Sequence, residues 1–195
     1  MKSKRQLQKE NTRKKILETA YQIYSEQGFS ATTAVIAKEA GVSHGTIFVH
    51  FSSLDELLCC LIQDFGDALG SEIHRLAETK DNIEELLKAH LDVLARHEKF
   101  YIRLIAERSL LPEEARLTFS NIQSIVAYHF NKVFERENNT CKDIPVHLLF
   151  NTWVGLIHYY LLNKDLFSPD MPIVERYGSE LTETFLKLIK NKRRI

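Results

Sequence analysis

Apolar residues recur every three to four positions along nearly the whole chain, which is the spacing of one face of an α-helix. No segment shows the strict alternation of apolar and polar residues that is typical of a half-buried strand. Gly28 and Gly41 interrupt the pattern, whereas Pro112 and Pro145 fall in first turns, where a helix tolerates proline. The sequence therefore predicts an all-α fold with about nine helices, over residues 12–27, 33–40, 44–50, 54–76, 83–96, 100–109, 112–137, 145–162 and 173–190.

The start of the fourth predicted helix is marked by Ser53, which Glu56 follows three residues later. This is the pattern of a capping box, in which a hydroxyl and a carboxylate bond free backbone amides. Asp55 and Glu56 also favour the positive end of the helix dipole. We therefore expect a firm helix start here, directly after three shorter helices.

Residues 148–162 are apolar on almost every side of their predicted helix. A helix of this kind packs into the core on one face and against something else on the other. A second subunit would be a suitable partner for the other face.

Charge is distributed unevenly although the formal net charge is zero. Residues 1–15 contain seven Lys or Arg and one acidic residue, whereas residues 59–195 contain 18 basic and 20 acidic residues. A basic arm on a near-neutral body suits local contact with phosphates. A solvated run of terminal charges is an equally open interpretation at this point.

The composition is that of an ordinary globular chain, with 195 residues, 44% hydrophobic and 27% charged. The three cysteines, Cys59, Cys60 and Cys141, are odd in number and lack ligand spacing, so we expect reduced thiols, no metal and no cofactor. The start of the chain lacks an apolar leader, and the strongly apolar stretch 153–162 is too short to cross a bilayer. We therefore expect a cytoplasmic protein without a membrane partner.

Residues 32–51 describe two short helices joined by a tight turn. Ala37 is small where two helix backbones approach, and Gly41 permits the positive φ that the turn needs. Val42 and Ile47 are placed to fill the joint. Such a unit presents its second helix outward, with the N-terminal residues available to a DNA major groove. Those residues are short or polar, and they are Ser43, His44, Gly45 and Thr46.

This segment resembles the TetR (tetracycline-repressor-like) family of transcriptional regulators. The resemblance covers residues 12–58 and begins with a basic amphipathic helix that ends at Gly28-Phe29. It continues through Ile36-Ala37, Ala40-Gly41-Val42-Ser43, Gly45-Thr46-Ile47-Phe48, His50-Phe51 and Asp55-Glu56-Leu57.

The resemblance implies a helix-turn-helix DNA-binding domain over residues 1–53, with its basic arm at 1–15, and a larger helical domain for ligand binding and dimerisation over 54–195. Members of the family are mostly repressors that bind a double-stranded, palindromic operator as homodimers and leave it when a small molecule binds. The last two long helices, here about 145–163 and 172–190, usually build the dimer interface. By position, the residues that would face DNA are Thr33, Ser43, His44, Gly45, Thr46, Phe48 and His50.

Three positions depart from the family pattern. Phe48 stands where tyrosine is common, so a hydroxyl that would reach a phosphate is missing. Leu54 stands where lysine is frequent, which removes another phosphate contact. The span from Gly28 to Ile36 is one residue shorter than the family pattern, which bears on the role of Thr33.

Aromatic and polar side chains on the later helices suggest a small-molecule pocket, although core packing explains each residue taken alone. As a group they fit an apolar or aromatic ligand with few polar anchors. Arg103 and Glu107 are four residues apart and either recognise a ligand or form a surface ion pair. The pocket candidates are Arg103, Glu107, Phe119, Tyr128, Phe150, Trp153, His158 and Tyr159.

Other functional classes have weaker support. Residues 41–45 match the G-x-S-x-G nucleophile elbow of hydrolases, but that elbow needs a preceding strand and a parallel sheet. A dimetal carboxylate bundle needs Glu-x-x-His, and no histidine follows a glutamate at that spacing. We therefore expect no enzyme activity. The alternative to a regulator is a helical protein-interaction module without sequence-specific DNA binding.

Overall fold

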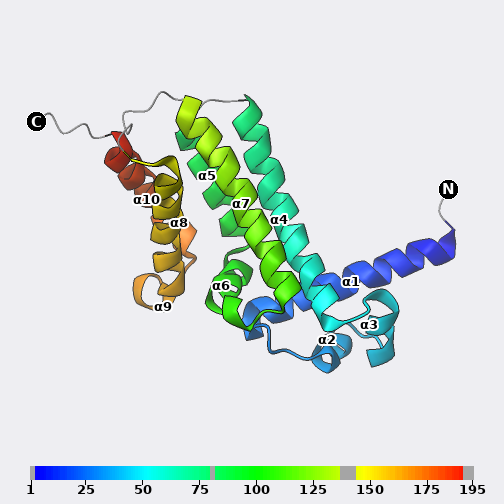
Figure 1. Cartoon of the computed structure of the whole chain (residues 1–195). Helices are drawn as coiled ribbons and strands as arrows, with labels where there is room; N and C mark the ends of the chain where they lie inside the picture. Colours follow the sequence, from blue (N-terminus) through cyan, green and yellow to red (C-terminus); the bar gives the residue numbers. More distant parts are fainter. Residues whose placement is uncertain (1–2, 80–81, 137–143, 191–195) are drawn as a thin grey trace, which may run out of the picture. The chain divides into compact units, whose positions relative to one another are not determined.

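The computed structural model describes residues 3–79, 82–136 and 144–190 (Figure 1). These residues confirm the all-α class, because they form ten α-helices and one 3₁₀ turn and include no strand. The helices are α1 Lys4–Gln27, α2 Thr33–Glu39, α3 His44–His50, α4 Leu54–Thr79, α5 Ile83–Arg96, α6 Glu98–Ala106, α7 Glu113–Arg136, α8 Val146–Leu162, α9 Lys164–Phe167 and α10 Ile173–Lys190.

The chain divides into two compact units. Unit 1 comprises Met1–Asp64 and Lys99–Thr118, and unit 2 comprises Phe65–Glu98 and Phe119–Ile195. Helices α4 and α7 each contribute to both units, so the units do not follow the chain in one uninterrupted order. The division at residues 53 and 54 that the family resemblance implies stays a prediction.

Helix α1 begins at Lys4, two turns before the predicted start at residue 12. Ser3 and Gln6 form a capping box, in which the Ser3 hydroxyl accepts from the Gln6 amide at 3.2 Å and the Gln6 side chain accepts from the Ser3 amide at 2.8 Å. The segment contains neither glycine nor proline, and its residues favour a helix. Most of the basic arm is therefore helical.

The predicted number of about nine helices is one short, because Lys164–Phe167 forms the separate helix α9. The Lys164 ammonium donates to the carbonyls of Ser168 and Met171 at 2.6 and 2.7 Å, which fastens the loop that follows. A helix of four residues is too short to show a periodic apolar face, so this element leaves no such signal in the sequence.

The core of unit 1 lies under its first helices. Ile16 and Ala20 of α1, Ile36 of α2 and Ile47 of α3 are fully buried. Phe100 of α6 is also buried, and its ring contacts Tyr21 of α1 with centroids 4.8 Å apart. The apolar stripe of α1 thus holds the two shorter helices and α6 together.

The core of unit 2 is formed by α5, α8 and α10 with parts of α4 and α7. Helix α10 packs against α5 and α8, and its N-terminus is capped by the buried carboxylate of Glu98. Glu98 accepts from the amides of Ile173 and Val174 at 2.9 and 3.0 Å. Gly66 lets α4 approach α7, because a Cβ atom there would clash with the Ile122 side chain.

No single helix among the described residues is long and apolar enough to cross a membrane. Helix α3 and residues 54–78 of α4 together have the length and composition of a membrane span, but the two are bent by 59° relative to each other.

Candidate nucleic-acid interface

The α2–turn–α3 unit is built around Gly41, whose φ of 63° lies in the left-handed region that favours glycine. After the turn, the Val42 amide donates to the Ala37 carbonyl at 3.0 Å. Ala40 and Ile47 are completely buried at the joint between the helices. The local sequence thus fixes the crossing of α2 and α3 and leaves the opposite side of α3 exposed.

Polar side chains at the start of α3 are bonded to one another. The Ser43 hydroxyl caps the helix by accepting from the Thr46 amide at 3.2 Å, and it lies 2.7 Å from the Thr46 hydroxyl. The Thr33 hydroxyl of α2 lies 2.7 Å from Nε2 of His44. These pairs hold exposed Ser43 and His44 together with half-buried Thr33 and Thr46, which prepares the four side chains to meet a ligand without further ordering.

Gly45 lies within this group and has open space around it. A Cβ atom at Gly45 would meet only the Ser43 hydroxyl, at 4.0 Å, so internal packing does not require glycine here. Glycine also costs roughly 1 kcal/mol relative to alanine inside a helix. Close approach of another molecule is a physical reason for glycine at such a position.

The remaining predicted contact residues differ in exposure. Phe48 is 46% exposed, and its ring meets the His44 ring edge-on at 5.2 Å. His50 is half-buried, and its Nδ1 atom is buried without a hydrogen-bond partner. Burial, together with Lys9 and Arg13, lowers the pKa of His50 below its ordinary value, which favours a neutral ring. Val49, which the sequence analysis does not single out, is 68% exposed beside Phe48.

Basic side chains of α1 belong to the same unit. Lys4, Arg5, Lys9, Lys14 and Lys15 are exposed, whereas Arg13 is used within the fold. The Arg13 guanidinium lies 4.7 Å from the centre of the Phe51 ring and 3.2 Å from the Cys60 sulfur. The ammonium of Lys15 is 3.6 Å from where a Cβ of Gly41 would be, which brings a cation to the turn.

The predicted capping box at the start of α4 is present in part. The Ser53 hydroxyl accepts from the Glu56 amide at 3.0 Å, as the pattern predicts. The Glu56 carboxylate, however, accepts from the amide and hydroxyl of Ser52, both at 2.6 Å, instead of from the Ser53 amide. These bonds to Ser52 lower the pKa of Glu56. They tie the end of α3 to the start of α4.

The chain is similar to known regulatory proteins. The sequence model of the bacterial regulatory proteins of the tetR family matches residues 16–59. The nucleoid occlusion factor SlmA of Vibrio vulnificus is 31% identical over 141 residues, which are 70% of this chain and 67% of SlmA. The chain belongs to the tetR family.

A helix-turn-helix transcriptional repressor of Mycobacterium tuberculosis is 37% identical over 82 residues, which cover 42% of this chain and 43% of the repressor. Several curated relatives are matched over only about two fifths of their own length, between 38% and 43%. The transcriptional regulator FadR of Bacillus subtilis, solved in complex with stearoyl-CoA, has a TM-score of 0.70 at 18% identity. That likeness covers 88% of this chain and 96% of FadR and concerns the fold.

The predicted ligand residues fall into different surroundings. Phe119, Phe150 and Trp153 are buried, His158 is half-buried, and Tyr128 and Tyr159 are 61% and 57% exposed. Trp153 donates from Nε1 to Nδ1 of His90, which is itself buried, at 3.0 Å. The six therefore differ in their access to solvent, and their common pocket stays a prediction.

Arg103 and Glu107 form the expected i, i+4 pair, with Nη1 and Oε1 3.2 Å apart. Both also bond the end of α1 within unit 1. Arg103 donates from Nη2 to the Glu26 carbonyl at 2.8 Å, and Glu107 accepts from the Phe29 amide at 2.8 Å. These hydrogen bonds thus join the C-terminal part of α6 and the residue after it to the end of α1 and the loop that follows α1.

The nucleophile-elbow alternative at residues 41–45 lacks its structural context. Ser43 caps a helix after a helix, and no strand precedes it in any described segment of the chain. Its hydroxyl is paired with Thr46, not with a histidine. The motif match therefore reflects the turn between two helices.

Proposed function

We propose that this protein is a ligand-responsive, DNA-binding transcriptional regulator that represses its target as a homodimer. The observation that carries the proposal is the exposed N-terminus of α3, where Ser43, His44 and Thr46 surround an unpacked glycine. Short polar side chains suit base edges and phosphates, and an open glycine allows the helix to enter a major groove closely.

Residues 1–53 would form the DNA-binding domain and residues 54–195 the ligand-binding and dimerisation domain. Base and phosphate contacts would come from Thr33, Ser43, His44, Gly45, Thr46, Phe48 and His50. Exposed lysines of α1 would add sequence-independent attraction that weakens as salt rises. Two half-sites of a palindromic operator would lie roughly 34–36 Å apart, or a multiple of that distance.

Homodimerisation through α8 and α10 is supported by the character of α8. This helix contains no charged residue, yet Leu148, Tyr159 and Leu162 are each about half exposed. Gly155 lies between them, and a Cβ there would meet nothing within 4 Å. An exposed, uncharged face with a central glycine suits close packing against the same helix of a second subunit.

A small, largely apolar effector would bind the larger domain and favour the arrangement that releases DNA. Support comes from the aromatic residues of that domain and from FadR of Bacillus subtilis, which was solved with stearoyl-CoA. For this chain we propose only the chemical class of the effector, which is an apolar or aromatic molecule.

The test is a fluorescence-anisotropy titration of the purified protein on the DNA upstream of its own gene, at several salt concentrations. We expect saturable binding that unrelated DNA does not compete away, with Thr46→Ala weakening it about tenfold. Ser71→Ala, an exposed hydroxyl on α4, is the matched control and should bind as the wild type does.

If no binding is seen there, selection from random DNA extends the search to other operators. A selected palindrome with half-sites at the expected spacing would support the regulator. Failure to enrich any sequence would favour the alternative, a helical interaction module without sequence-specific DNA binding.

A further inference from the structure

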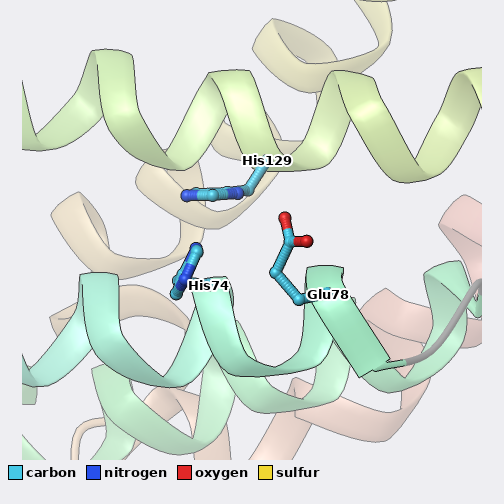
Figure 2. Close-up of side chains that lie close together, drawn as sticks. All are labelled: His74, Glu78 and His129. Carbon is cyan, nitrogen blue, oxygen red and sulfur yellow. The ribbon is translucent and has the colours of Figure 1, made fainter.

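Three side chains with metal-binding atoms meet between α4 and α7 in unit 2. His74 and Glu78 are four residues apart on α4, so they project from the same face of the helix. Figure 2 shows both pointing toward His129, which comes from α7. One ligand atom from each residue lies within 4.8 Å of the other two. The sequence pattern predicted no metal site, because the third residue is far away in the chain.

His129 has an unsatisfied polar atom in its ring. The residue is 7% exposed, and its Nδ1 is buried without a hydrogen-bond partner. Buried polar atoms in folded proteins are nearly always bonded, so an unpartnered imidazole nitrogen calls for an unseen partner. A neutral imidazole nitrogen can bind a metal cation through its lone pair.

Two imidazoles and a carboxylate are a ligand set that Zn²⁺ prefers, and three protein ligands leave a fourth position open. In a tetrahedral Zn²⁺ site the ligand atoms are about 3.3 Å apart, given metal–ligand bonds of about 2.0 Å. The three atoms must therefore draw together by about 1.5 Å at most. The exposed side chains of His74 and Glu78 can supply this movement, while buried His129 stays in place.

The Glu78 carboxylate accepts a hydrogen bond from the Lys132 ammonium, so a cation already stands beside the cluster.

Lys132 is also a competitor. Its ammonium lies 2.5 Å from Oε1 of Glu78, so a metal ion would have to displace it or bind the other oxygen. Arg136 is a further cation that acts on Glu78, and it donates from Nη1 to the Ala77 carbonyl at 2.9 Å. Removal of the Lys132 charge should therefore strengthen metal binding. Removal of a metal ligand should instead weaken it.

We propose that His74, Glu78 and His129 form a binding site for one divalent transition-metal ion per protomer, with Zn²⁺ as the preferred ion. The bound ion would join α4 to α7. Its open position would accept water or an anionic group of a second ligand. This proposal does not depend on the DNA-binding function.

The test uses the full chain without an affinity tag and freed of metal. Zn²⁺ is titrated by calorimetry, and Co²⁺ is added in parallel to record the visible absorption of a low-symmetry site. We expect one ion per protomer. His74→Ala and His129→Ala should each weaken Zn²⁺ binding by about 100-fold or more and abolish the Co²⁺ spectrum.

Two variants complete the design. Lys132→Met should tighten Zn²⁺ binding about tenfold by removing the competing charge. His147→Ala, an exposed histidine on α8 outside the cluster, should bind as the wild type does. Because His129 is buried, thermal unfolding without metal checks that the His129→Ala variant is folded. His74 is exposed, so His74→Ala tests metal binding without disturbing the core.

The proposal is overturned if the wild type binds no Zn²⁺, or if His74→Ala and His129→Ala bind it with unchanged affinity and stoichiometry. An unchanged affinity in Glu78→Gln would remove Glu78 from the ligand set.

Discussion

At the scale of single residues, Gly45 has opposite effects on helix stability and on the expected binding of DNA. It lies inside α3, where glycine weakens the helix, and no described residue needs the space beside it. Gly45→Ala should therefore raise the free energy of unfolding by up to about 1 kcal/mol. The same methyl group would stand where the major groove is expected, so operator affinity should fall while stability rises.

The measurement combines urea unfolding with the anisotropy titration. Gly70→Ala is the matched control, because Gly70 is also a helical glycine with nothing within 4 Å of a Cβ. It should gain similar stability and leave operator affinity unchanged. Undiminished DNA binding by Gly45→Ala would show that α3 does not approach DNA closely at this residue.

At the scale of elements, a buried hydrogen bond connects α5 to α8. The Trp153 indole donates to Nδ1 of His90, which is 3% exposed and can accept only while that nitrogen is unprotonated. Burial, with a smaller effect of His158, lowers the pKa of His90 from 6.5 to about 3. Because the unfolded chain binds the proton more readily, the free energy of unfolding must fall as pH drops from about 6.5 toward 3.

This linkage predicts a defined loss in acid. At pH 5 the contribution of His90 should be about 2 kcal/mol lower than at pH 8. His50, His97 and His129 also have lowered pKa values, so the wild type alone would not isolate the effect. His90→Gln keeps an acceptor for Trp153 and cannot be protonated. The wild-type minus variant difference, measured by urea unfolding across this range, should show the loss, and a flat difference would contradict it.

The helices themselves were largely predictable from the spacing of apolar residues. The ends of α5, α8 and α10 lie within one residue of the expected positions, because Asn82, Pro145 and the stripe of α10 are local signals. The early start of α1 was not predicted, because its first turns are polar and have no buried face. Only the capping box at Ser3 marks that start, and it is not followed by an apolar run.

The candidate sites were predictable to different degrees. The α2–turn–α3 unit is contiguous, so its turn, cap and exposed residues all lie within 20 residues of sequence. The cluster of His74, Glu78 and His129 brings together two helices that are far apart in the chain. A search for Glu-x-x-His could not find it, because here the histidine precedes the glutamate and the third ligand depends on how α4 and α7 pack.

At the scale of the whole molecule, the proposed regulator needs two subunits, and α8 is where their contact should be decided. Its exposed face has no charge, and Gly155 marks the point where a second backbone would come closest. The Cβ atom of a side chain introduced at Gly155 would meet no atom of the described residues within 4 Å. In a dimer a charged side chain there would be buried without a partner, which costs several kcal/mol.

Gly155→Glu should therefore convert the dimer to a folded monomer, as measured by sedimentation velocity alongside circular dichroism. Gly70→Glu places the same change at the comparable glycine of α4 and should remain dimeric. A monomer has a single recognition helix and cannot bind two half-sites at once. Operator affinity should therefore fall by at least about 100-fold in Gly155→Glu and stay unchanged in Gly70→Glu. A dimeric Gly155→Glu would move the subunit contact away from this face of α8, whereas a monomer that binds the full operator as tightly as the wild type would remove the need for two subunits.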